Sequence, residues 1–250
     1  MQLPTISTPT YEVKILSREK PLKFRPFLVK EQKLMMMAVE AKDPRENINI
    51  MKQITKNCVL EDIDVDSLSL VDFEILFLNF RARSMGEIIN VYYKCKNEFI
   101  GSEDEITQTC NMVMDVPINL LEVDVINSEN EKRIMISDDV GIQMKLPTFE
   151  VIEKLMSTDP DDEEEINDAE YKAAAMCIEY VFDKDSIYYA KDATLDEMMN
   201  FIYSLPPGKY EKIENYFKNL PTIRQESEAI CSKCGFKHKF VLEGLNDFFI

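Results

Sequence analysis

The sequence contains no tryptophan, a single histidine, His238, and only six glycines among its 250 residues. The glycines form no dinucleotide-binding fingerprint, phosphate-binding loop or nucleophile elbow, all of which need glycines at close, defined spacings. One histidine also leaves few ways to assemble an acid–base pair or a catalytic triad. These absences exclude most familiar enzyme classes and favour a protein without catalytic activity.

Long apolar runs and a targeting segment are missing as well. The first residues, MQLPTISTPTYEVKIL, lack the basic start, apolar stretch and small-residue cleavage site of a signal peptide. No segment approaches 18 consecutive apolar residues, the length that indicates a transmembrane helix. We therefore expect a cytosolic protein that does not contact membranes.

Positive charge is scarce relative to negative charge. The chain has 29 Lys and Arg residues against 46 Asp and Glu residues, which gives a formal net charge of -17 at pH 7. Such a charge repels the phosphate backbone of nucleic acids and anionic lipid surfaces. The expected partners are therefore other proteins, and nucleic acid is not expected among them.

The apolar patterning predicts an α+β fold in which helices flank a mixed β-sheet. With 45% apolar residues, no internal repeat and no Gly/Ser linker, residues 1–250 are expected to form a single domain. The expected segments, in order, are a β-rich start at 1–30, a helical part at 31–87, a β-rich middle at 88–146, a helical part at 147–222 with an acidic loop at 159–170, and a zinc-knuckle tail at 223–250.

The strongest helix is predicted in the segment SLSLVDFEILFLNFRARSMGE. Ser69 and Asp72 have capping-box spacing, and Gly86 stands where a helix C-cap is expected. Large apolar residues cover most of the circumference of this helix, which is typical of a central core helix. Further along, AEYKAAAMCIEYVF at 169–182 is expected to be helical, and Thr194 begins a later helix.

Six cysteines are too few for a disulfide scaffold, and cytosolic thiols stay reduced, so clustered cysteines indicate a metal site. The sequence Cys231-Ser-Lys-Cys234-Gly is typical of a zinc knuckle, because two intervening residues let both sulfurs face one ion and glycine permits a left-handed turn. Cys95 and Cys110, which frame a polar loop between two strand-like segments, are predicted to complete a four-cysteine zinc site, with His238 as an alternative ligand.

Four thiolates leave no open position for water or substrate, so this zinc ion is expected to be structural and to join the tail to the middle sheet. Free surface thiols and a redox dithiol are the alternatives, and the absence of a preceding βαβ pattern disfavours the dithiol. Cys58 and Cys177 lie on the apolar faces of predicted helices, and both are expected in the core.

Two other features have alternative interpretations. The acidic run at 159–170 lacks the order of a calcium-binding loop, so a solvated loop is favoured over a cation site. The methionines at 35–37, with Met198 and Met199, either fill the core or line an adaptable groove for a partner, and core filling is favoured.

Several motifs, in this order, resemble the baseplate hub family of T-even-type contractile-tailed bacteriophages. They are LKFRPFLVKEQKLMMMA, the helix LSLVDFEILFLNFRARSMGE, YYKC, and CSKCG followed by LEGLNDFF. The resemblance covers essentially the whole chain. Two departures are an acidic insertion near residues 159–168 and the wide separation of Cys95 from Cys110.

The resemblance implies a role in building the central hub of a contractile tail. The chain would be either a hub subunit or a chaperone-like assembly factor for hub and tape-measure proteins of the same phage. It would act in the host cell cytoplasm and, as a subunit, in the virion. A different class, a zinc-ribbon adaptor in phage transcription or replication, is suggested by the knuckle and opposed by the negative charge. A third class, a metallohydrolase, is disfavoured because it would need an open metal position, which a site of four thiolates does not have.

Overall fold

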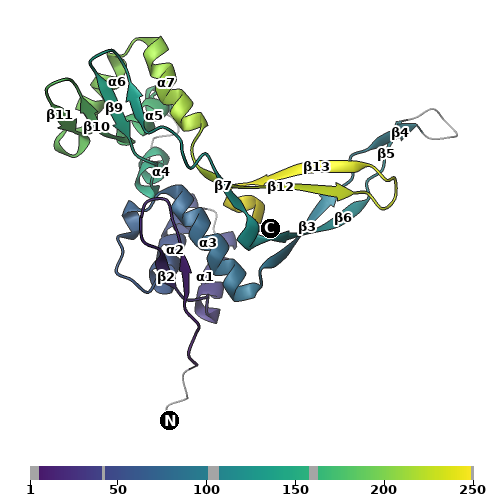
Figure 1. Cartoon of the computed structure of the whole chain (residues 1–250). Helices are drawn as coiled ribbons and strands as arrows, with labels where there is room; N and C mark the ends of the chain where they lie inside the picture. Colours follow the sequence, from purple (N-terminus) through teal and green to yellow (C-terminus); the bar gives the residue numbers. More distant parts are fainter. Residues whose placement is uncertain (1–5, 41–42, 101–106, 158–162, 249–250) are drawn as a thin grey trace.

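The computed structural model describes residues 6–40, 43–100, 107–157 and 163–248. They form three connected parts, shown in Figure 1. The described residues of 6–87 form the body, those of 88–126 and 222–248 form a projecting arm, and those of 127–221 form the lobe. The arm and the lobe extend away from each other (Figure 1).

The body consists of a β-hairpin followed by three α-helices within its described residues. Strands β1 (Tyr11–Val13) and β2 (Leu22–Phe24) pair antiparallel and are followed by α1 (Val29–Glu40), α2 (Pro44–Cys58), the 3-10 helix η1 (Val65–Ser67) and α3 (Leu70–Met85). Helix α3 is buried on most sides, which confirms the predicted core helix. Its buried large apolar residues are Val71, Phe73, Ile75, Leu76, Phe77, Leu78 and Phe80.

Asp72 has a larger role than the predicted cap. Its carboxylate accepts hydrogen bonds from the backbone and hydroxyl of Ser69, which confirms the capping box. The same carboxylate accepts from the backbone N–H groups of Leu16, at 2.8 Å, and Ser17, at 3.2 Å. One buried side chain therefore both starts α3 and fixes the chain that follows β1.

The arm is built from two thin antiparallel sheets. Strand β3 (Ile88–Lys94) pairs with β6 (Val113–Asn119), and a second hairpin of β4 (Glu98–Ile100) and β5 (Thr107–Thr109) lies between them in the sequence. The other sheet has the order β13 (Lys237–Glu243), β12 (Thr222–Ile230) and β7 (Asp124–Ile126). Alternate side chains of each sheet are buried, and the rings of Tyr93 and Phe240 stack between the two sheets with centroids 4.8 Å apart.

The lobe contains a four-stranded antiparallel sheet and four helices. The strand order is β11 (Ile187–Tyr189), β10 (Ile178–Phe182), β9 (Gly141–Met144) and β8 (Arg133–Met135). The helices are α4 (Phe149–Met156), α5 (Glu163–Met176), α6 (Leu195–Tyr203) and α7 (Pro207–Lys218), and Thr194 caps α6 as predicted. The remaining elements of the described residues are short 3-10 helices: η3 (Ala190–Asp192) in the lobe, and η2 (Leu120–Glu122) and η4 (Leu245–Phe248) in the arm.

The structure corrects two predictions in the lobe. Residues 178–182 form strand β10 and not the end of a helix, because their backbone pairs with β9 and β11 and most of their side chains are β-branched or aromatic, which favours strands. The acidic run is not a loop throughout: residues 163–170 lie in α5, whereas residues 159–162 lie outside the described residues. Acidic residues near a helix N-terminus are favourable for the helix dipole, which the loop prediction neglected.

The predicted α+β class is confirmed. All strand pairs of the described residues are antiparallel, and the strands form several small sheets in place of one mixed sheet. Hairpins account for the pairs β1–β2, β4–β5, β8–β9, β10–β11 and β12–β13, whereas β9–β10 and β7–β12 are antiparallel although long segments separate their strands in the sequence. Among the helices of the described ranges, none combines the length and the apolar character that crossing a bilayer requires. The assignment of residues 1–250 to a single domain stays a prediction.

Candidate metal centre

The first two cysteines flank the β4–β5 hairpin on the arm. Cys95 directly follows β3, and Cys110 lies between β5 and β6. The Cys95 N–H donates to the carbonyl of Met112, at 2.7 Å, and the Cys110 N–H donates to the carbonyl of Asn97, at 2.8 Å. Strands β4 and β5 between the two cysteines pair as a hairpin, so the two thiols lie close together despite their wide separation in the sequence.

The other two cysteines lie in the turn between β12 and β13. The Gly235 N–H donates to the Cys231 carbonyl at 2.8 Å, and the Cys231 N–H donates to the Phe236 carbonyl at 2.9 Å. Gly235 has a φ of 73°, in the left-handed region that the knuckle sequence predicts. This turn aims both sulfurs at the end of β3.

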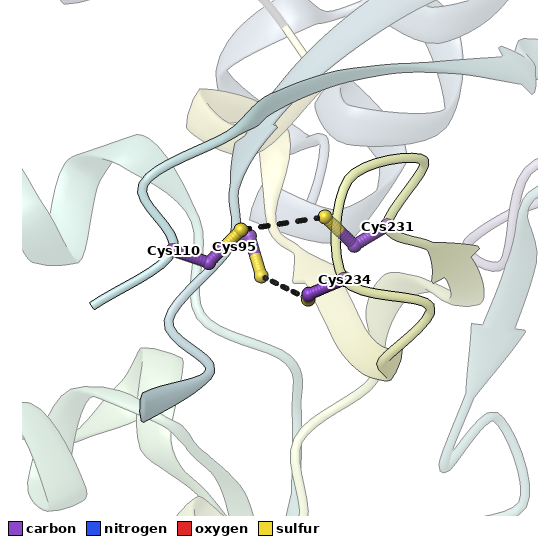
Figure 2. A group of neighbouring side chains, drawn as sticks. All are labelled: Cys95, Cys110, Cys231 and Cys234. Carbon is purple, nitrogen blue, oxygen red and sulfur yellow. Dashed lines mark hydrogen bonds between the residues drawn. The ribbon is translucent and has the colours of Figure 1, made fainter. Parts of the chain in front are cut away.

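The four predicted residues meet at one point, as Figure 2 shows. The Sγ atoms of Cys95 and Cys234 are 3.6 Å apart, those of Cys110 and Cys231 are 3.7 Å apart, and all four lie within 4.8 Å of one another. A disulfide needs about 2.05 Å between sulfurs. Tetrahedral zinc with Zn–S bonds of about 2.3 Å places its sulfurs about 3.8 Å apart. The spacing therefore fits four ligands around a metal ion and not two disulfides. We call this group the clasp.

The surroundings of the clasp favour thiolate at some positions and thiol at others. Backbone N–H groups of Cys234 and Lys233 donate to the Cys231 sulfur and lower the pKa of that thiol to about 6. Burial raises the pKa of Cys95 to about 12. A metal ion binds thiolates, so its binding displaces the protons of thiols such as that of Cys95.

His238 lies beside the clasp. Its Nε2 atom is 3.1 Å from the Cys95 Sγ, within hydrogen-bond distance, and its buried ring contacts the rings of Tyr93 and Phe236. The four sulfurs form a complete set without the imidazole, so the position suits a residue that orients a ligand. Asn97 was not predicted. Its side-chain amide lies 3.7 Å from the Cys234 sulfur, and the only signal in the sequence was its place two residues after Cys95.

The remaining cysteines are apart from the clasp, as predicted. Cys58 and Cys177 are fully buried, and burial raises the pKa of each thiol to about 12. The methionines do not form one groove, because Met36 and Met37 are exposed on α1 whereas Met198 is buried on α6 in the lobe.

Comparison with protein families matches the family described as "T4 bacteriophage base plate protein" over residues 8–250. No curated protein and no solved structure gives a match.

Proposed function

We propose a role in assembly of the baseplate hub for this chain, which belongs to the family of T4 bacteriophage base plate proteins. The family match carries the proposal because it extends over the body, the arm and the lobe. The chain acts either as a hub subunit or as an assembly chaperone for hub and tape-measure proteins of the same phage. It works in the host cytoplasm and, as a subunit, is retained in the virion tail.

The surface of the arm supports contacts with other proteins. On the outer face of the β3–β6 pair, Ile88 is 56% exposed, Tyr92 is 73% exposed and Val113 is 54% exposed. Exposed aromatic and aliphatic side chains gathered on one face are typical of protein interfaces. The net charge of -17 opposes nucleic acid as the partner of this surface.

The clasp holds one structural zinc ion through Cys95, Cys110, Cys231 and Cys234. The fit between the sulfur spacing and tetrahedral coordination supports this assignment. Zinc at this point cross-links the β3–β6 layer to the β12–β13 layer at the far end of the arm. Because protein sulfurs occupy every position, the ion does not activate water, and the proposed function is non-enzymatic.

Capture of separately purified hub and tape-measure proteins by the tagged full chain tests the partner class. We expect at least one of them to bind at about 150 mM salt, where long-range attraction between surface charges is screened. Substituting Ile88→Ser and Tyr92→Ser should weaken capture, whereas Val29→Ser and Met36→Ser, which change exposed residues of α1, should leave it unchanged. Retention of DNA with no capture of either protein would contradict the proposal and favour a nucleic-acid adaptor.

Mass spectrometry of purified mature particles distinguishes the two forms of the proposal. A subunit is present at a fixed ratio to the other hub proteins. An assembly chaperone is absent from particles and present in complexes from infected cells. Absence from both samples would contradict a role in hub assembly.

A further inference from the structure

A cleft of about 420 Å³ opens in the lobe, between α4, the end of α5, β10 and the start of α6. These elements lie at the opposite end of the molecule from the β12–β13 turn that carries the clasp (Figure 1). The volume is within the range of clefts that bind small ligands or anchoring side chains. Neither the clasp nor the exposed face of the arm involves this cleft.

The floor of the cleft is apolar. Its buried residues are Val151, Ala175, Ile178 and Met198, and the half-buried Met176 forms part of the wall. Methionine side chains have several low-energy rotamers and adapt to the shape of an apolar ligand. The floor therefore fits one large aliphatic or aromatic side chain.

The rim of the cleft carries more cations than anions, in contrast to the chain as a whole. Lys145, Lys154 and Lys191 line it together with Glu150 and Glu179. Lys154 is paired with Glu150 at 3.1 Å, so this pair contributes no net charge. Within the described residues, no carboxylate lies at ion-pair distance from Lys145 or Lys191.

The position of Lys191 also leaves its charge available to a ligand. Its ammonium group lies 5.2 Å from the centre of the Tyr189 ring, an interaction that holds the side chain at the rim and does not neutralise it. Burial of an apolar anchor next to these two lysines excludes water and strengthens any ion pair made there. A carboxylate beside the anchor is the group that complements this rim.

We propose that this cleft binds a short segment of another protein, which inserts one large apolar side chain into the floor and places a carboxylate against Lys145 and Lys191. The proposal rests on the proposed function only for the class of partner, a protein. Nucleic acid is the wrong ligand, because Glu150 and Glu179 flank the same opening and the whole chain is acidic. With the arm as one contact surface, the cleft gives the molecule a second one at its other end.

Methionine methyl groups provide the test, because the full-length protein labelled at its methionine methyls reports the cleft through Met176 and Met198. The probes are acetylated, amidated hexapeptides in which Leu, Phe or Tyr is followed by Glu, each compared with the same peptide containing Gln. We expect at least one Glu peptide to shift both methyl signals saturably and to bind at least tenfold more tightly than its Gln counterpart. The exposed Met36 and Met85, far from the cleft, should not shift.

Charge reversal locates the binding. The double substitution Lys145→Glu and Lys191→Glu should weaken peptide binding at least tenfold. The matched control, Lys14→Glu and Lys33→Glu, makes the same charge change at exposed positions of the body and should leave binding unchanged. Equal weakening in both variants would assign the effect to net charge and overturn the proposal.

Four other outcomes would also overturn it: no peptide shifts the two methyl signals, the Gln peptide binds as tightly, a DNA duplex shifts them instead, or they shift with protein concentration alone. The last outcome would assign the cleft to a second copy of the chain. No hub or tape-measure protein takes part in this experiment. Its failure therefore leaves the capture of hub and tape-measure proteins unaffected, and failure of capture does not decide the peptide result.

Discussion

Replacing Asp72 by alanine removes the acceptor that joins the start of α3 to the N-terminal hairpin. The fully buried carboxylate accepts at 2.8 and 3.2 Å from Leu16 and Ser17, and at 3.0 and 2.5 Å from the N–H and hydroxyl of Ser69. A hydrogen bond to a charged group contributes about 1.5–3 kcal/mol, and such bonds to one acceptor are not additive. We therefore expect Asp72→Ala to lower the free energy of unfolding by about 4 kcal/mol.

Urea unfolding followed by circular dichroism measures this loss. With an m-value of about 2 kcal/mol per M, the midpoint should fall by about 2 M. Asp72→Asn keeps one acceptor oxygen, which can still accept from the N–H groups of Leu16 and Ser17. Its free energy of unfolding should therefore fall by only about half as much. As a control, Asp64→Ala removes the cap of η1, which is exposed, and should cost about 1 kcal/mol or less. A loss below about 1 kcal/mol for Asp72→Ala, or an equal loss for Asp72→Asn, would refute the reasoning.

Three further predictions concern the clasp, a buried ion pair and a close contact in the lobe. The His238→Ala variant should still bind one metal ion per chain, about 10–100-fold more weakly in competition with a chromophoric chelator. Complete loss of the metal would indicate that the imidazole is itself a ligand. Burial alone would raise the pKa of Glu31, but the hydrogen bond from Arg25 lowers this pKa below its ordinary value of 4.5. The stability that this pair contributes is therefore fully present above pH 4.5 and is lost as the pH falls through the lowered pKa. Glu31→Gln should therefore cost about 3 kcal/mol near pH 7 and flatten the acid limb of the stability profile, and an unchanged limb would contradict this. In Gly141→Ala the new Cβ would lie 2.3 Å from the Phe182 ring, so thermal unfolding should show a loss of about 1–3 kcal/mol that Phe182→Leu partly restores, whereas no loss would contradict the packing.

Local patterns in the sequence were sufficient for the features that depend on neighbouring residues. The capping box at Ser69 and the helix start at Thr194 form as predicted, because each depends only on residues three positions apart. The four cysteines also lie together as expected, since the spacing of Cys231 and Cys234 indicates one half of the group and few other cysteines remain; their role as metal ligands stays a prediction.

Features that depend on distant residues were not predictable in this way. The segment 178–182 became a strand because β9 and β11 pair with it, although the preceding alanine-rich sequence favours a helix. The second role of Asp72 and the ion pair of Arg25 with Glu31 require the hairpin and the helices to be packed first. The cleft is formed by four separate elements, so no single stretch of sequence marks it.

Metal analysis of the purified full-length chain tests the central claim, that four cysteines close the arm of this baseplate protein around one zinc ion. Under reducing conditions, elemental analysis should give about one zinc ion per chain. Cys231→Ser should weaken or abolish retention of this zinc through gel filtration, whereas Cys58→Ala, which changes a buried cysteine outside the clasp, should leave the ratio at one. A wild-type chain that is folded, reduced and free of zinc after zinc is supplied would contradict the account.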